Sequence, residues 1–297
     1  MARAAVDIGS NSLLLTIVDD QGAIVHDEAR VAGLGRGLGD RGLLAPDRIA
    51  AAEAILADYV RTAQLHGVSP GAIRAVATSA ARRAMNAQTW FQRVQRQLGL
   101  RVRIISGDDE ARFTWLGAQR DLEVTEGPLL VVDLGGGSTE VVLGEGAQIY
   151  ERVSLEIGSV RLTEQWLGLG TASPSALARL RNQVDTAVGS LKMEPIPRNV
   201  VAVAGTATTL AAMALGLDRY DAARVHGSRL TKTELGRFVD RLLVAGPDER
   251  RQIAAVSPER ADFLLAGAVI LDRLLTAARR QQLIVSDRGL RFGLLAG

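Results

Sequence analysis

The sequence predicts an α/β protein built from two domains of comparable size. The chain has 297 residues, which exceeds the length at which one hydrophobic core normally stops growing. Two strands joined by a polar glycine turn occur once around Gly9 and again around Gly135. Each occurrence continues into alternating helices and strands, a pattern that is typical of a largely parallel sheet flanked by helices.

The first half of the chain begins with apolar runs at residues 4–8 and 13–18, separated by the turn formers Gly9, Ser10 and Asn11. This arrangement predicts a hairpin. The elements expected after it are a strand at 24–29, a helix at 46–66, a strand at 73–77, a helix at 89–98, a strand at 102–105 and a helix at 108–120. Either Ser106 or Asp108 would cap the start of the last helix.

The second half repeats this opening after the Gly127-Pro128 pair. The expected elements are strands at 129–132, 139–143 and 149–155, a helix at 173–191, a strand at 200–204, helices at 231–244 and 259–278, and a strand at 283–286. Because the repeat restarts between residues 122 and 127, we predict domains at 1–124 and 125–297.

Composition narrows the possible classes of protein. The chain has no cysteine, so it forms neither disulfides nor thiolate metal sites, and a reducing compartment is expected. The start lacks the pattern of a signal peptide and every apolar run is too short for a membrane span, which predicts a cytoplasmic protein. Formal net charge is only +2, and aromatic residues, at 4%, do not alternate with basic clusters. Nucleic-acid binding is therefore not expected.

The two turns carry the strongest chemical signal. The segments DIGSNS at 7–12 and DLGGGS at 133–138 each place an aspartate at the end of a strand, followed by glycine and small polar residues. Glycines admit positive torsions and close approach, so backbone N–H groups can converge on a phosphate oxygen. The two aspartates can hold a divalent cation. One such turn is usually only a hairpin, but two at matching places predict a phosphate site. Neither matches a Walker loop or a dinucleotide fingerprint.

Paired turns of this kind resemble those of actin, hexokinase and the heat-shock ATPases. The order of motifs over almost the whole chain is similar to that of the Ppx/GppA phosphatase family: DIGSNS (7–12), ATSAAR (77–82), SGDDEAR (106–112), DLGGGSTE (133–140), GSVRL (158–162), AGTATTL (204–210), VHG (225–227) and SDRGLR (286–291). The resemblance implies two ribonuclease-H-like (actin-like ATPase) domains with an interdomain cleft. It also implies an exopolyphosphatase or a guanosine pentaphosphate phosphohydrolase.

The resemblance assigns roles to three acidic residues. Glu110 falls at the family's catalytic glutamate, which would position and deprotonate water. Asp133 and Glu140 fall at the family's Mg²⁺ positions, with Asp7 facing the same space and Mn²⁺ as the alternative metal. The alternatives are structural: acidic residues near Asp108 favour a helix N-terminus, and Glu140 would be an exposed strand residue.

Arg82 matches a basic position of the family, and Gly205-Thr206 stands where the superfamily borders its nucleoside or distal phosphate site. Arg260, which opens the predicted helix at 259–278, is a further candidate anion contact. The structural alternatives are a solvated arginine and a strand-to-helix turn capped by Thr206. The predicted phosphate-binding set is Asp7, Gly9, Ser10, Asn11, Ser12, Arg82, Gly135, Gly136, Gly137, Ser138, Gly205, Thr206 and Arg260.

Two positions depart from the family pattern, because Leu14 and Gly33 stand where basic residues are common, with Arg36 just beyond Gly33. The preferred interpretation is a magnesium-dependent exopolyphosphatase acting on inorganic polyphosphate. The alternatives are a pppGpp 5′-phosphohydrolase acting on a guanosine polyphosphate, a weakly catalytic sensor, and a kinase of the wider superfamily. The chain ends soon after residue 293. By resemblance, such a short member is expected to favour shorter polyphosphates or a nucleotide. The resemblance favours a homodimer.

Overall fold

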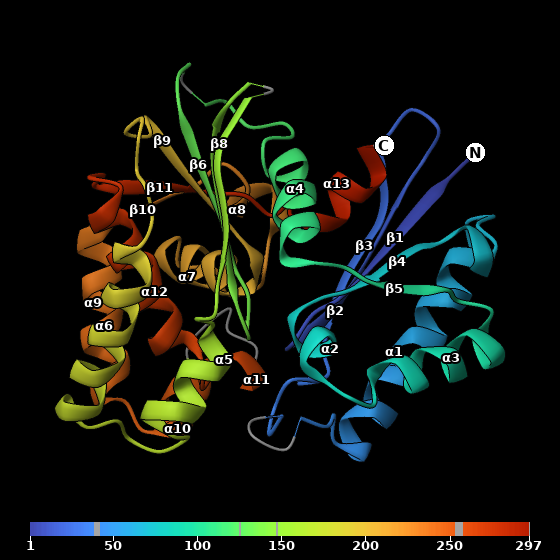
Figure 1. Cartoon of the computed structure of the whole chain (residues 1–297), viewed down its shortest axis with the longest axis horizontal. Coiled ribbons are helices and arrows are strands. Elements are labelled where there is room, and N and C mark those ends of the chain that lie inside the picture. The colour runs from blue at the N-terminus through green and yellow to red at the C-terminus, as the bar shows by residue number, and fades with distance from the viewer. Residues whose placement is uncertain (39–41, 125, 147, 253–257, 297) are drawn as a thin grey trace. The chain divides into compact units, whose positions relative to one another are not determined.

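The computed structural model describes residues 1–38, 42–124, 126–146, 148–252 and 258–296 (Figure 1). Its contacts divide the chain into two compact units, one of Met1–Gly117 with Leu290–Gly297 and one of Ala118–Gly289. Domains were expected at 1–124 and 125–297, so the observed division differs at both ends of the second unit. The last residues return to the first unit because Leu290, Leu294 and Leu295 are buried there.

The first unit contains a five-stranded sheet in the order β3-β2-β1-β4-β5. Its strands are β1 (Arg3–Ile8), β2 (Ser12–Val18), β3 (Ile24–Val31), β4 (Arg74–Ala77) and β5 (Val102–Ile104). The first three strands pair antiparallel, whereas β4 pairs parallel with both β1 and β5. The predicted hairpin and the strand-helix alternation are confirmed.

The two faces of this sheet pack against different helices. Ala4, Val6 and Ile8 join a core with the helices α1 (Pro46–Leu65) and α3 (Ala87–Leu98). Ala5, which points to the opposite face because strand side chains alternate, packs with the C-terminal helix α13 (Leu290–Ala296). Asp7 shares that second face with Ala5.

The second unit contains a six-stranded sheet in the order β10-β11-β9-β6-β7-β8. Its strands are β6 (Leu129–Leu134), β7 (Thr139–Glu145), β8 (Gln148–Leu155), β9 (Asn199–Val203), β10 (Arg229–Thr231) and β11 (Gln282–Val285). Read as β8-β7-β6-β9-β11, the order reproduces that of the first sheet, and β10 adds an antiparallel edge. The repeat predicted from the sequence is thus a repeat of topology, as expected for two ribonuclease-H-like domains.

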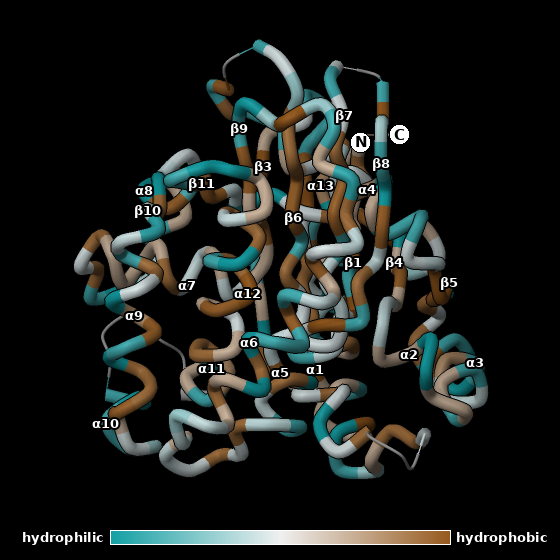
Figure 2. The backbone as a smooth tube through the Cα atoms, turned by 60° about the vertical axis from the view of Figure 1, so that its left-hand side comes forward, coloured by the Kyte–Doolittle hydropathy of each residue, from teal (hydrophilic) through white to brown (hydrophobic). Residues whose placement is uncertain are grey.

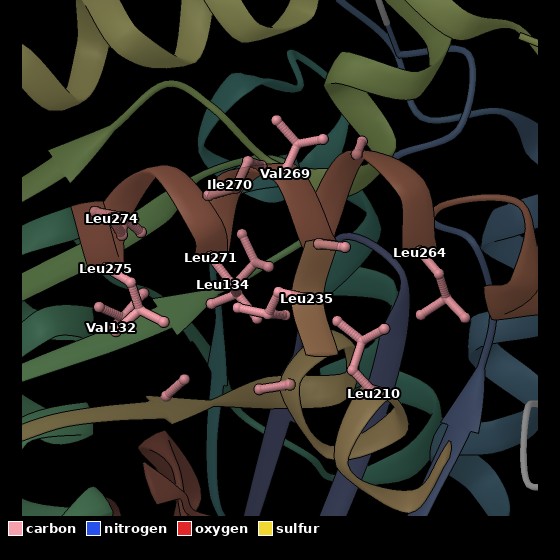
Figure 3. Close-up of a cluster of buried hydrophobic side chains, with 14 of the residues drawn as sticks. Val132, Leu134, Leu210, Leu235, Leu264, Val269, Ile270, Leu271, Leu274 and Leu275 are labelled. Carbon is pink, nitrogen blue, oxygen red and sulfur yellow. The ribbon is translucent and has the colours of Figure 1, made fainter. Parts of the chain in front are cut away.

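One face of the second sheet is covered by the helices α6 (Pro174–Gly189), α7 (Ala204–Ala214), α9 (Lys232–Val244) and α12 (Leu264–Ala277). Figure 3 shows the side chains of α12 packed with Val132 and Leu134 of β6. In Figure 2 strand β6 is almost uniformly hydrophobic, as expected of a central strand. Asp133, between these two core residues, therefore points to the other face.

The predicted helix at 259–278 is two helices, α11 (Pro258–Ala261) and α12, because the chain turns at Asp262-Phe263. The helix predicted at 108–120 is α4 (Gly107–Ala118). Short elements without a strong sequence signal are the helices α2 (Ser79–Arg83), α5 (Ser159–Leu162), α8 (Ala222–Val225) and α10 (Pro247–Arg251), the 3₁₀ turn Pro70–Ala72 and the π-helical turn Thr163–Leu167. Among the described helices, none combines the length and apolarity that crossing a membrane requires.

Candidate active site

The two hairpin turns have the same local geometry. The N–H of Gly9 donates to the carbonyl oxygen of Ser12 at 3.0 Å, and the N–H of Gly135 donates to that of Ser138 at 3.0 Å. A Cβ on either glycine would lie 3.0 Å from the same carbonyl oxygen. Neither glycine is among the described residues with positive φ. Within these turns, Gly9 and Gly135 therefore provide space for the carbonyl oxygen and do not provide a positive φ.

The first turn is fixed by the loop that follows β3. The N–H of Gly35 donates to the carbonyl oxygen of Ser10 at 2.6 Å, and that of Gly33 donates to Asn11 at 2.8 Å. A Cβ on Gly35 would lie 3.1 Å from the Cβ of Ser10. The glycine loop therefore packs directly on the turn and occupies its carbonyl groups.

The second turn is fixed in the same way by the segment that follows β8. The N–H of Ser159 donates to the carbonyl oxygen of Gly135 at 3.0 Å, and that of Val160 donates to Gly136 at 3.0 Å. A Cβ on Gly158 would lie 2.5 Å from the carbonyl carbon of Gly136, well inside van der Waals contact. The repeat thus includes a glycine segment that holds each turn, a role of Gly158 that the sequence analysis missed.

These contacts use the carbonyl side of both turns and leave the amide side open. Within the described chain, no hydrogen bond takes up the backbone N–H groups of Ser10, Asn11, Gly136 or Gly137. Successive N–H groups in such turns form a concave anion site. Each turn can therefore donate backbone hydrogen bonds to an anion.

Asp133 and Glu140 lie directly opposite each other on the antiparallel strands β6 and β7. Side chains of such a pair leave the same face of the sheet with Cβ atoms about 4.5–5.5 Å apart. Glu140 is 2% exposed, which excludes the alternative of an exposed strand residue, and its Oε1 accepts a 2.8 Å hydrogen bond from the Oγ of Ser154. Like charges in this position oppose each other unless a cation lies between them.

Two opposed carboxylates are a donor set that Mg²⁺ accepts, since this ion prefers oxygen ligands and keeps several waters. No group of three or more acidic or histidine residues suited to a metal occurs among the described residues. A site made by Asp133 and Glu140 would therefore depend on water and on substrate oxygens for its other ligands.

The first unit lacks the second carboxylate. Asp7 pairs with Leu14 in the register that pairs Asp133 with Glu140. The repeat therefore places Leu14 at the position equivalent to Glu140, so the two-carboxylate arrangement belongs to the second unit. Asp7 itself lies on the face of the first sheet that packs against α13 and Phe113 of α4.

Glu110 lies in the first turn of α4, whose start is capped by Ser106, since Ser106 Oγ accepts from the N–H of Asp109 at 3.0 Å. Glu110 is buried, with 7% of the residue exposed. Arg82, at the end of α2, donates from Nη1 to Glu110 Oε2 at 2.5 Å and to the carbonyl oxygen of Ile105 at 3.2 Å. The structure thus brings two predicted site residues together, with Arg82 holding the carboxylate of Glu110.

Two more predicted residues, Gly205 and Arg260, meet at the end of β9. Val203 is paired with Asp133, and the next residue, Ala204, has φ 72°, a strained conformation for alanine. Gly205 follows, and a Cβ there would lie 2.9 Å from Nη1 of Arg260. The guanidinium of Arg260 is therefore packed on the backbone at the same sheet edge as Asp133.

The side chain of Thr206 has a structural role. It is 8% exposed and packs on Gly267 of α12, where a Cβ would overlap its methyl group. It does not cap α7, whose N-cap residue makes no side-chain hydrogen bond. Among the described residues no hydrogen bond takes up the hydroxyl of Thr206, so Thr206 stays a candidate anion contact.

Two other residues near the motifs have defined places. Arg36 folds over Gly33, where a Cβ would lie 2.8 Å from its Nε, so a basic group stands beside the first turn after all. His226 accepts at Nδ1 from the N–H of Asp287 at 3.3 Å, and its Nε2 lies 3.2 Å from the carbonyl oxygen of Asp121. Burial lowers the pKa of His226, although nearby Asp287 opposes the shift. Both ring nitrogens of His226 thus lie against backbone groups, which gives this residue a structural place.

Comparison with known proteins supports the motif assignment. The model of the Ppx/GppA phosphatase family matches residues 15–297. Exopolyphosphatase 2 of Mycobacterium tuberculosis is 35% identical over 311 aligned positions, which cover 98% of this chain and 96% of that protein. A crystal structure of the Aquifex aeolicus member of the Ppx/GppA protein family is 34% identical with a TM-score of 0.82, covering 99% of this chain and 96% of that one. An exopolyphosphatase structure from Cytophaga hutchinsonii, at 24% identity and TM-score 0.92, covers 100% of this chain and 97% of its own and shares the fold.

Proposed function

The chain belongs to the Ppx/GppA phosphatase family, and from this premise we propose that it is an exopolyphosphatase that releases terminal orthophosphate from inorganic polyphosphate. The proposal rests on the two hairpin turns. Hydrogen bonds to their carbonyl oxygens fix both turns, and within the described chain these bonds leave backbone N–H groups of the turns unused. A phosphoanhydride chain offers unbridged oxygens at every phosphorus, which suits such donors. The similarity to a curated exopolyphosphatase over nearly the full length supports the same substrate class.

The reaction requires attack of water on the terminal phosphorus. Glu110 accepts one proton of that water as the new oxygen–phosphorus bond forms. The bond between this phosphorus and its bridging oxygen breaks, and the electron pair leaves with the shortened polyphosphate chain. Arg82 keeps the Glu110 carboxylate oriented through their ion pair and is a positioning residue.

The second unit supplies charge compensation. The N–H groups of Gly136 and Gly137 bind phosphate oxygens, and the guanidinium of Arg260, packed on Gly205, adds a cationic donor at the same sheet edge. Magnesium held by Asp133 and Glu140 would neutralise negative charge on the phosphoryl oxygens. Buried Glu140 keeps its orientation through the hydrogen bond from Ser154.

A substrate panel tests the proposal. Orthophosphate release is measured from polyphosphate, pppGpp and ATP, each with Mg²⁺, with Mn²⁺ and with EDTA, for the unaltered chain and for Glu110→Gln. We expect release from polyphosphate that requires the divalent ion and falls by about 100-fold or more in the variant. Faster release from pppGpp than from polyphosphate would assign the chain to pppGpp 5′-phosphohydrolases. Tight polyphosphate binding with no Glu110-dependent release would indicate a sensor.

A further inference from the structure

A second cationic site lies in the second unit, away from the turns. A cavity of about 300 Å³ is lined by Arg198, Arg229, Arg279 and Arg280, together with the amides of Gln281 and Gln282. No acidic side chain lines it. Among the described residues, none of these four arginines forms an ion pair with a carboxylate. Four positive charges therefore converge on one cavity without internal compensation.

The cavity lies at the amino end of the strands whose carboxyl ends carry the candidate active site. Arg198 precedes β9 and Gln281 precedes β11, and these two strands are parallel. Asp133 and Gly205 mark the opposite edge, because Asp133 pairs with the last residue of β9. At about 3.3 Å per residue, the five residues of β9 separate the two edges by about 13 Å.

The backbone is adapted to hold Arg198 in this place. Gly127 has φ 113°, a conformation that other residues rarely adopt, and a Cβ there would lie 2.7 Å from the Cδ of Arg198. The N–H of Arg198 also donates to the carbonyl oxygen of Pro128 at 2.6 Å. Glycine at position 127 thus makes room for the arginine side chain.

A second adaptation places the arginines that follow α12. Arg279 has φ 53°, a left-handed conformation that is unfavourable for a residue with a side chain. Arg280 donates from Nε to the carbonyl oxygen of Pro197 at 2.6 Å, which fixes the plane of its guanidinium. A helix C-terminus favours basic residues, but Arg198 and Arg229 come from other elements. The helix C-terminus therefore does not explain why all four arginines line the cavity.

We propose that this cavity is a second anion site that binds a diphosphate group, either as free pyrophosphate or as part of a nucleotide. Guanidinium groups bind phosphate oxygens through paired hydrogen bonds, and four of them match an anion of several charges. The volume is at the lower end of ligand cavities, which fits a small anion. Gln281 and Gln282, which also line the cavity, carry neutral amide donors.

The test is a site-resolved arginine footprint of the full chain. The protein is treated with phenylglyoxal, and modification of each arginine is followed by mass spectrometry during titration with pyrophosphate, ADP or sulfate at matched ionic strength. We expect pyrophosphate to protect Arg198, Arg229 and Arg279, but not Arg237 and Arg241 on the exposed face of α9. Equal protection of both sets, no protection, or equal protection by sulfate would overturn the proposal.

Two paired variants complete the test. Arg198→Gln with Arg279→Gln should raise the pyrophosphate concentration that half-protects Arg229 by about tenfold or more. Arg237→Gln with Arg241→Gln removes the same charge and should leave that concentration unchanged. If both pairs behave alike, the site does not exist. Stronger protection by ADP than by pyrophosphate would assign the diphosphate to a nucleotide, and the reverse would assign it to the free anion. The readout is independent of hydrolysis and therefore of the proposed function.

Discussion

Substitution of Gly158 by alanine tests whether the second turn must be held in its observed geometry. The added Cβ would lie 2.5 Å from both the carbonyl carbon and the carbonyl oxygen of Gly136, and 2.6 Å from the carbonyl carbon of Gly137. These are backbone atoms that cannot rotate away. Either the turn shifts, or the hydrogen bonds from Ser159 and Val160 lengthen.

Overpacking of this kind typically costs about 1–3 kcal/mol, which corresponds to about 2–4 °C in the unfolding midpoint per kcal/mol for a unit of this size. Displacement of the turn by about 1 Å should also lower kcat by about 100-fold, because positioning of the phosphate is lost. Thermal unfolding followed by circular dichroism and phosphate release from polyphosphate measure the two effects.

Gly236→Ala is the matched control, since a Cβ at Gly236 in helix α9 would meet no atom within 4 Å. It should stabilise the protein by about 0.5–1 kcal/mol and leave kcat unchanged. A Gly158→Ala protein with the wild-type unfolding midpoint and wild-type kcat would refute both the close contact of Gly158 with Gly136 and the role of the second turn in catalysis.

Three further predictions concern charged and titratable groups. Glu140→Gln removes one of two opposed carboxylates, so without divalent ions its unfolding midpoint should rise by about 1–2 °C, while stabilisation by added Mg²⁺ should shrink; an unchanged response to Mg²⁺ would argue against a metal at this pair. Arg82→Gln should lower kcat by about tenfold or more with partial rescue in Arg82→Lys, whereas a change in KM alone would mean that Arg82 contacts substrate. Since burial lowers the pKa of His226, the unfolded chain binds more protons, and the unfolding free energy should fall as pH drops below about 6.5, by at most about 1.4 kcal/mol per pH unit. Denaturant titrations from pH 5 to 8 should show that the unfolding free energy depends less steeply on pH in His226→Asn than in the unaltered chain. An equal dependence on pH would contradict the assignment.

Much of the architecture follows from local sequence signals. The apolar runs on either side of the turns at Gly9 and Gly135 predicted both hairpins, and their repetition predicted two units with the same order of elements along the chain. The capping role of Ser106 was also predictable, because serine precedes three acidic residues at the start of an apolar-periodic helix.

Other features depend on contacts between distant segments. Gly158 lies three residues after the end of β8, and nothing near it in the sequence indicates that its hydrogen atoms face the carbonyl group of Gly136. The return of Leu290 and its neighbours to the first sheet was missed because seven residues are too few to show a packing partner. The pairing of Arg82 with Glu110 joins residues 28 positions apart, which no periodicity reveals.

The site candidates illustrate the same limit. The register that sets Asp133 against Glu140 follows from the turn length, so the carboxylate pair was accessible from the sequence once the strands were placed. The inward packing of Thr206 on Gly267 was not, because it depends on how α12 crosses the start of α7.

The most direct test of the proposed chemistry compares two neighbouring carboxylates on one helix. Phosphate release from polyphosphate in the presence of Mg²⁺ is measured for Glu110→Gln and for Asp109→Asn, each checked for a wild-type unfolding midpoint. Glu110 is buried against Arg82, whereas Asp109 lies in the first turn beside Ser106 without that contact. We predict a loss of about 100-fold or more in kcat for Glu110→Gln and a change of less than about twofold for Asp109→Asn. Equal rates in the two variants would contradict the assignment of Glu110 as the group that accepts the proton of water.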